Sequence, residues 1–286
     1  MERIAWLNGY FVPLADARIS AQDRGFLFAD GIYEFTAVLD GRLIDSAAHL
    51  ARFERSAAAL ELRIPISIGE IEAVQRALIA CNALDQGGVY LQLTGGPAER
   101  DFLAESAAPT LFMFTQAAEI VDRPAARTGI AVVTMPDPRW ARRDIKSIML
   151  LGQVLAKREA ASAGAQEAWL VQDGFVTEGA SSSALIVTQD GTLITRPNSQ
   201  AILPGCTCRA VLAIAERDGV AVDERLFTVA EALDAREAIL TSASNFVLPV
   251  VTIDGKKIGP GTPGPVARRL RELYIEAARS AGAAHE

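Results

Sequence analysis

The first 120 residues combine two hydrophobic periodicities. Residues 3–44 alternate short apolar runs with Asn-Gly and Asp-Gly turns, a pattern typical of hairpins and short strands. From residue 46 apolar side chains recur every three or four positions, which predicts a helix over 46–62. The spacing of Ser67 and Glu70 has the form of a capping box and predicts a second helix that ends near residue 84. Two apolar runs predict buried strands at 89–94 and 110–115.

The second half of the chain begins after a polar, proline-containing segment at 121–128, which lacks apolar periodicity. We predict a linker there, between a small domain at 1–120 and a larger one at 129–286. In the larger domain the predicted helices and strands intermix without a regular βαβ rhythm, which favours the α+β class. Strands are predicted at 129–134, 167–172, 184–187, 220–225 and 237–241, and helices at 148–163, 207–218 and 265–281.

Composition and charge narrow the class of protein. Half of the 286 residues are apolar and 22% are charged, so the chain has material for a packed core. The net charge of −7 opposes binding to a phosphate backbone, and no apolar run approaches the roughly 18 residues of a membrane span. Charges stand too early at the N-terminus for a signal peptide. Three sparse cysteines, Cys81, Cys206 and Cys208, favour a reducing compartment, so we expect a cytoplasmic protein without nucleic-acid or membrane partners.

Candidate chemistry has to come from residues other than histidine. The chain has only His49 and His285, and it lacks nucleotide-loop, zinc-protease and nucleophile-elbow motifs, so no metal is expected. Lys146 follows Arg142 and Arg143. Neighbouring cations and partial burial favour the neutral amine that attacks a carbonyl carbon. Taken alone, this string also fits solvated surface charges.

Two further segments have a functional and a plain interpretation. Glu178 precedes a glycine and three serines. This segment is either a polar turn or a carboxylate that faces a cationic ring nitrogen. Residues 203–207 form a Pro-Gly turn at a predicted helix start, where backbone N–H groups and the helix dipole suit a phosphate group. Such a turn is also found as an ordinary helix cap.

Six segments, in this order and spacing, resemble the fold-type IV pyridoxal-phosphate enzymes, and among these the D-amino-acid transaminases. The resemblance covers about residues 3–275. It implies a small N-terminal α/β domain and a larger, barrel-like C-terminal domain, with pyridoxal 5'-phosphate in the interdomain cleft of a homodimer. The loop at 95–108 would complete the cleft of the other subunit. The segments are 23–26, 30–34, 49–53, 144–147, 177–179 and 203–207.

The resemblance also implies roles for individual residues. Lys146 would form the Schiff base with the cofactor and then move the proton, and Glu178 would keep the pyridine nitrogen protonated so that the ring accepts electrons. Tyr33 would lie near the Schiff base and hold Lys146 or the substrate carboxylate. Arg52 would bind the phosphate group. The remaining cofactor-binding residues would be Leu203, Gly205, Cys206, Thr207, Ser242 and Ala243.

The predicted reaction is transfer of the amino group of a D-amino acid, such as D-alanine or D-glutamate, to 2-oxoglutarate or pyruvate. Arg100 would grip the substrate α-carboxylate, with Phe102, Ser182 and Tyr33 also in the substrate site. The chain departs from the family pattern here. Gly95 stands where an arginine is common and Phe102 where a histidine is common. Ser183 and Cys208 also replace frequent residues, an asparagine and a basic side chain.

Three alternatives remain open on the sequence. The first is a branched-chain or (R)-amine transaminase, which shares the fold. Arg100 favours a D-amino acid over these substrates. Aminodeoxychorismate lyase also has this fold and would eliminate pyruvate instead of transferring an amino group. A relative that only binds the cofactor would be expected to lack Lys146 or Glu178, and both are present.

Overall fold

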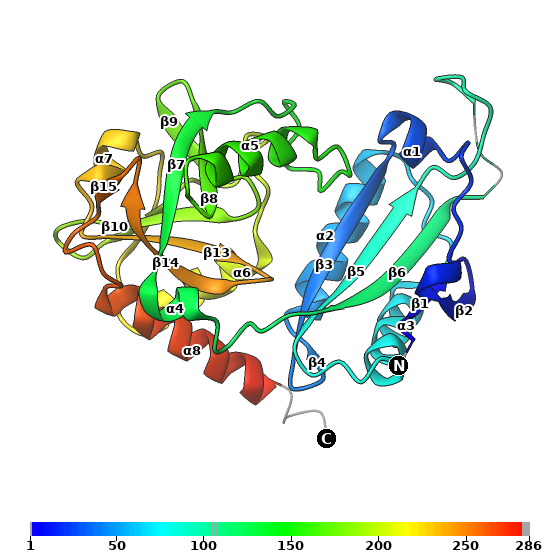
Figure 1. Cartoon of the computed structure of the whole chain (residues 1–286), viewed down its shortest axis with the longest axis horizontal. Helices are drawn as coiled ribbons and strands as arrows, with labels where there is room; N and C mark the ends of the chain where they lie inside the picture. Colours follow the sequence, from blue (N-terminus) through cyan, green and yellow to red (C-terminus); the bar gives the residue numbers. More distant parts are fainter. Residues whose placement is uncertain (1, 105, 107, 282–286) are drawn as a thin grey trace. The chain divides into compact units, whose positions relative to one another are not determined.

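The chain folds into two compact units. A computed structural model describes residues 2–104, 106 and 108–281. Unit 1 consists of residues 1–120 and 145–149, and unit 2 of residues 121–144 and 150–286 (Figure 1). The segment 145–149 therefore belongs to unit 1, although its neighbours in the sequence belong to unit 2. The domain limits drawn from the sequence remain a prediction.

Unit 1 contains a six-stranded sheet in the order β2-β1-β6-β5-β3-β4, with antiparallel pairing throughout. Over residues 32–36 the side chains of β3 alternate between a buried face and a half-buried face that carries Tyr33 and Phe35, and residues 37–39 are all buried. This alternation is the period of two expected for a strand. The strands are β1 (Ile4–Leu7), β2 (Tyr10–Pro13), β3 (Gly31–Leu39), β4 (Arg42–Leu43), β5 (Gly87–Thr94) and β6 (Thr110–Ala117).

Two longer helices of unit 1, α2 (Ser46–Ala59) and α3 (Ile68–Cys81), pack on the sheet. Phe53 of α2 and Leu78 of α3 are fully buried. The predicted capping box is confirmed, because the Ser67 hydroxyl accepts from the Glu70 N–H and the Glu70 carboxylate accepts from the Ser67 N–H. Unit 1 also contains the short helices η1 (Leu14–Asp16) and α1 (Arg24–Phe28).

Unit 2 is built on a curled mixed sheet in the order β12-β11-β10-β13-β14-β7-β8-β9, with β15 paired to β14. Parallel pairs join β7 to β8 and to β14, while β13 pairs antiparallel with both neighbours. The strands are β7 (Ile130–Pro136), β8 (Glu167–Gln172), β9 (Phe175–Gly179), β10 (Ser183–Val187), β11 (Leu193–Thr195), β12 (Val222–Glu224), β13 (Glu237–Ser242), β14 (Phe246–Ile253) and β15 (Lys256–Lys257). The mixed order confirms the predicted α+β class.

The helices of unit 2 cover parts of this sheet. α8 packs on β13, β14 and α6, while α5 packs on β7 and β8. Trp169 of β8 and Phe227 are fully buried in the main core of the unit, with ring centroids 6.2 Å apart. The helices are α4 (Pro124–Thr128), α5 (Leu151–Ser162), α6 (Cys206–Arg217), α7 (Val229–Leu233) and α8 (Pro265–Ala281). No helix among the described residues is both long enough and apolar enough to cross a membrane.

Candidate active site

Lys146 lies beside strand β3 of unit 1. The Tyr33 N–H donates to the Lys146 carbonyl oxygen (2.9 Å), and the Ile148 N–H donates to the Gly31 carbonyl oxygen (3.0 Å). Residues 145–149 therefore run along the start of β3. The Lys146 Nζ lies 4.3 Å from the centroid of the Tyr33 ring, a geometry in which the ring face attracts an ammonium group. The structure thus brings together two residues that the sequence assigned to one site.

A buried ionic cluster, Glu34 with His49 and Arg52, continues from β3 into α2. The Arg52 Nε donates to one Glu34 oxygen (2.7 Å) and its Nη2 to the other (2.8 Å), where the His49 Nδ1 also lies within 2.9 Å. Burial raises the pKa of Glu34, but Arg52 and His49 outweigh this effect and lower the pKa to about 2. Arg52 is thus a buried member of an ion cluster and not the surface cation of an ordinary helix. Its role toward a phosphate group remains a prediction.

Arg100 and Phe102 lie in the loop that follows β5, and both approach Phe28 of α1. The Arg100 guanidinium carbon is 5.7 Å from the centroid of the Phe28 ring, and the Phe102 centroid is 5.1 Å from it. Arg100 is exposed, and Phe102 is 76% exposed. Residues 105 and 107 of this loop lie outside the described residues.

Arg24 holds the same loop from α1. Its Nη1 donates to the carbonyl oxygens of residues 101 (2.9 Å) and 104 (3.0 Å), and its Nη2 donates to that of residue 102 (3.2 Å). Its Nε forms an ion pair with Asp30 (2.6 Å). A Cβ added at Gly95 would come within 2.8 Å of the Asp30 carboxylate and 3.1 Å of the Arg24 Cδ. A glycine in place of the arginine common in the family therefore leaves room for this ion pair.

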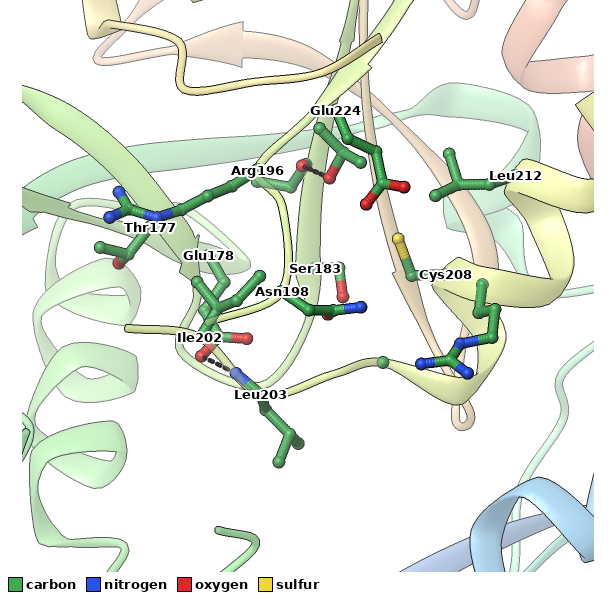
Figure 2. Close-up of a pocket in the computed structure, with 14 residues that line it drawn as sticks. Thr177, Glu178, Ser183, Arg196, Asn198, Ile202, Leu203, Cys208, Leu212 and Glu224 are labelled. Carbon is green, nitrogen blue, oxygen red and sulfur yellow. Dashed lines mark hydrogen bonds between the residues drawn. The ribbon is translucent and has the colours of Figure 1, made fainter. Parts of the chain in front are cut away.

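Glu178 lies in strand β9 of unit 2 and is 5% exposed. Its Oε1 accepts a hydrogen bond from the Leu203 N–H (3.0 Å), shown as a dashed line in Figure 2. The same oxygen accepts from the Arg139 Nη1 (2.5 Å). The interpretation of this segment as a solvent-exposed polar turn is therefore wrong. A buried carboxylate with charge-assisted partners is suited to facing a cationic group.

Arg139 connects Glu178 to a second buried carboxylate, that of Asp137. The Arg139 Nε and Nη2 donate to the two Asp137 oxygens (2.9 and 2.7 Å). The Thr177 hydroxyl donates to Asp137 as well (2.8 Å). Burial raises the pKa of Asp137, but the bonds from Arg139 and Thr177 outweigh it and lower the pKa below its usual range.

The turn at 203–207 leads into helix α6. Gly205 is the N-cap and supplies no side-chain acceptor to the first turn, so the backbone N–H groups at this end are not capped from there. A Cβ added at Gly205 would lie 2.6 Å from the Ser183 Oγ and 3.1 Å from the Cβ of Cys208, so a larger residue here would displace the Ser183 side chain. Cys206 and the buried Thr207 open the helix. This geometry fits the anion site expected from the sequence.

A small cavity of about 30 Å³ lies behind this turn, lined by Glu178, Ser183, Asn198 and Cys208 among others (Figure 2). Its volume suits one or two water molecules. A cofactor needs several hundred cubic ångströms. The cavity is therefore not the cofactor site itself.

Three further predicted residues have local partners in unit 2. The Ser182 hydroxyl donates to the buried carboxylate of Glu167 (2.9 Å). Ser242 ends strand β13, and its hydroxyl accepts from the Asn245 side-chain amide (2.9 Å). Ala243 follows in the turn that leads to β14. Their roles toward substrate and cofactor remain predictions.

The sequence did not identify the partners of these charged residues. The family motifs include Glu34 but neither Asp137 nor Arg139. Asp137 and Arg139 lie close to Lys146 in the sequence, in a segment rich in charge that directly follows strand β7. That placement is a signal that could have pointed to buried ion pairs, since unpaired charges are almost never fully buried.

The chain matches a known protein family. Residues 31–253 match the family described as Amino-transferase class IV. The D-alanine aminotransferase of Staphylococcus haemolyticus is 39% identical over 282 residues, which cover 96% of this chain and 99% of that protein.

Solved structures show the same fold. The branched-chain amino acid aminotransferase of Escherichia coli aligns with a TM-score of 0.91 at 22% identity, covering 97% of this chain and 95% of that one. A hypothetical aminotransferase of Mycobacterium tuberculosis, in its PLP-bound form, aligns with a TM-score of 0.85 at 25% identity. The alignment covers 97% of this chain and 99% of that one.

Proposed function

The chain belongs to the class IV amino-transferase family, and on this basis we propose that it is a pyridoxal-phosphate-dependent transaminase of D-amino acids. The donors would be of the D-alanine or D-glutamate type, and the acceptor a 2-oxo acid such as 2-oxoglutarate or pyruvate. The 39% identity to a D-alanine aminotransferase over 96% of the chain carries the choice of substrate. The branched-chain aminotransferase of Escherichia coli shares the fold at only 22% identity, which makes it a weaker guide to the substrate.

The described residues fit the cofactor by their donor and acceptor chemistry. Glu178 is a buried acceptor that suits a ring N–H, and Leu203 lies next to it. Gly205 leaves the first turn of α6 without a side-chain cap, which suits a phosphate group, with Cys206 and Thr207 at the helix start. Arg52 would also bind the phosphate group, as the resemblance to the family implies. Ser242 and Ala243 would complete the set.

Bound pyridoxal phosphate supplies an electron sink for the pair of electrons left when a proton leaves the substrate Cα. Lys146 would supply the amine that holds the cofactor covalently, and the same amine would accept and return that proton. The Tyr33 ring face, 4.3 Å from the Lys146 Nζ, would orient this amine. Glu178 would keep the ring nitrogen of the cofactor protonated, because a buried carboxylate favours a cation beside it.

Arg100 would bind the α-carboxylate of the substrate, with Phe102 and Ser182 nearby in the substrate site. Loss of a charge-assisted pair costs about 2 to 3 kcal/mol, so Arg100→Ala should lower kcat/KM for D-alanine by roughly 30- to 150-fold. An (R)-amine has no carboxylate, and its kcat/KM should change little. An equal loss for both substrates would make Arg100 structural.

The proposal includes a cytoplasmic homodimer. Both units expose large apolar side chains, which are common where a partner subunit binds. They include Phe26 (77% exposed), Phe102 (76%), Leu103 (89%), Leu151 (67%), Val154 (41%) and Leu155 (47%). The three free cysteines suit a reducing compartment. Light scattering should give a dimer, and a fully active monomer would contradict this part of the proposal.

Borohydride reduction of the purified protein tests the covalent role of Lys146. Reduction should fix the cofactor on the peptide that contains Lys146, and the other three lysines, Lys157, Lys256 and Lys257, are internal controls. Lys157 is paired with Glu167 (2.9 Å), so we expect it to remain unlabelled. Labelling of another lysine, or of none, would overturn the assignment.

The substrate class is tested by colour. D-alanine should bleach the bound cofactor, and 2-oxoglutarate should restore it. With a lyase of the same fold, the oxo acid would not restore the colour. Turnover of branched-chain L-amino acids without turnover of D-alanine would replace the D-amino-acid proposal by the branched-chain alternative.

A further inference from the structure

Arg139 of unit 2 connects two buried carboxylates. Its Nη1 donates to Glu178 (2.5 Å), while its Nε and Nη2 donate to Asp137 (2.9 and 2.7 Å). The three side chains are between 1% and 6% exposed. A guanidinium that donates through all three nitrogen atoms has its plane set by its partners.

Asp137 anchors this arrangement to the strand that carries Glu178. Thr177, which precedes Glu178 in β9, donates its hydroxyl to Asp137 (2.8 Å). The Arg139 N–H also donates to the Asp137 carboxylate (3.0 Å), and the Asp137 N–H donates to the Val171 carbonyl oxygen of β8 (2.9 Å). Arg139 is therefore held by two adjacent strands and has little freedom to leave Glu178.

The cluster keeps its charges. Burial lowers the pKa of Arg139, but its bonds to Asp137 and Glu178 outweigh burial and raise the pKa above the usual arginine value. Arg143 adds a second cation, with its Nε 3.5 Å from Asp137. A buried carboxylate needs such a partner to remain ionised, because an unpaired charge away from water is very costly.

We infer that Arg139 is a positioning residue that acts through Glu178. Held by Asp137, it fixes the Glu178 Oε1 and keeps the carboxylate ionised, so that Glu178 faces the ring nitrogen of the cofactor as an anion with a fixed orientation. The inference rests on the proposed function, in which Glu178 faces that nitrogen. A plain ion pair that only stabilises unit 2 is the alternative.

The test compares Arg139→Gln with Arg269→Gln, a matched loss of charge in the same unit. Arg269 also donates through Nε and Nη2 to a carboxylate, that of Asp218, but it is 54% exposed and lies outside the Glu178 cluster. We expect Arg139→Gln to raise the Kd of pyridoxal phosphate for the apoenzyme about 10-fold and to lower kcat about 30-fold, the range seen when an outer partner is lost at metal sites. The KM for D-alanine should change less than about threefold. Arg269→Gln should stay within about twofold of wild type in all three.

A double-mutant cycle with Glu178→Gln separates positioning from stability. If Arg139 acts through Glu178, Arg139→Gln should lower kcat by less than about threefold in the Glu178→Gln background. Arg139→Lys keeps the positive charge but loses the planar set of guanidinium donors. Its affinity for the cofactor should therefore lie between those of Arg139→Gln and wild type. The same cycle is run with Arg139→Lys if Arg139→Gln does not fold.

The outcomes distinguish this inference from the proposed function. If Glu178→Gln lowers kcat strongly and the two substitutions lower kcat by independent factors that multiply in the double mutant, only the role of Arg139 is overturned. Normal Kd and kcat in Arg139→Gln with a lowered Tm of the apoenzyme would make the ion pair purely structural. A Glu178→Gln variant near wild type would overturn the role of Glu178, and the inference with it.

Discussion

Among the described residues, each unit contains a buried cluster in which an arginine meets at least one carboxylate, but the central group differs. In unit 1 the centre is an acid, Glu34, and two side chains of α2 meet its oxygens: Arg52 donates to Oε1 and Oε2, and the His49 Nδ1 lies 2.9 Å from Oε2. Removal of Glu34 would leave the Arg52 guanidinium without its acid. This cluster stabilises the packing of α2 on β3, and it also holds a guanidinium that can bind an anion.

In unit 2 the centre is a base, Arg139, and the acids Asp137 and Glu178 bond to different nitrogen atoms. Asp137 is tied to a neighbouring strand through its backbone, while the hydrogen bonds described for Glu178 from Leu203 and Arg139 converge on Oε1. In the second cluster, therefore, Asp137 is the anchor, and Glu178 is oriented through Arg139. The central residue therefore has a mainly structural role in unit 1 and a positioning role in unit 2.

The largest effect is expected from Glu34→Gln. The change leaves the buried Arg52 and His49 without their acid, and breaking a buried pair in this way costs about 3 to 5 kcal/mol. Urea unfolding should show this loss in the free energy of unfolding. Glu72→Gln is the matched control, because its pair with Arg76 is exposed and is worth only about 0 to 1 kcal/mol. Equal losses in the two variants would remove the distinction between buried and exposed pairs.

A second test uses pH. The pKa of Glu34 is lowered from 4.5 to about 2 in the folded chain, so the unfolded chain binds this proton more tightly. The contribution of Glu34 is fully present above pH 4.5 and is lost as pH falls toward 2, on the order of 3 kcal/mol in total. The free energy of unfolding of wild type should fall more steeply between pH 4.5 and 3 than that of Glu34→Gln. Parallel pH curves would contradict the lowered pKa.

The two clusters also show what a sequence can reveal. The capping box at Ser67 and the helix Pro265–Ala281 were predicted because their signals lie within a few residues. The partners of Glu34 and Glu178 come from segments 18 and 39 residues away, and no local pattern selects them. The motif order still identified Lys146 and Tyr33 through resemblance, although their contact depends on how segment 145–149 lies along β3.

Some strands were also missed for a physical reason. Strand β14 contains Pro249, which lacks a backbone N–H and argues against a central strand. The structure nevertheless places β14 between β13 and β7. In β9 the hydrophilic residues Thr177 and Glu178 suggested a turn, but both are buried and satisfied by partners from other segments. Tertiary pairing therefore overrode the local pattern at both positions.

A smaller effect is expected when the anchor of the unit 2 cluster is weakened. Thr177→Val removes the hydroxyl that donates to Asp137 but keeps the contact between Arg139 and Glu178. The same hydroxyl also lies 3.0 Å from the Leu170 carbonyl oxygen and accepts from the Arg139 Nη2 (3.4 Å), and loss of the hydrogen bonds of a buried hydroxyl costs about 1 to 3 kcal/mol. The free energy of unfolding should fall by that amount, while kcat stays within a factor of a few. A fall in kcat as large as that of Arg139→Gln would make the anchor as important as the arginine itself.

The smallest effect should come from helix caps, where the two units are alike. Ser67 of unit 1 and Thr228 of unit 2 each form a capping box, with Glu70 and Glu231. Replacement of either hydroxyl residue by alanine should cost about 1 kcal/mol, because one backbone N–H loses its acceptor. Urea unfolding measures this loss, and activity should stay unchanged since neither cap touches the buried clusters of Glu34 and Arg139. A much larger loss at Thr228 than at Ser67 would show that unit 2 depends on its short helix α7 more than unit 1 depends on α3.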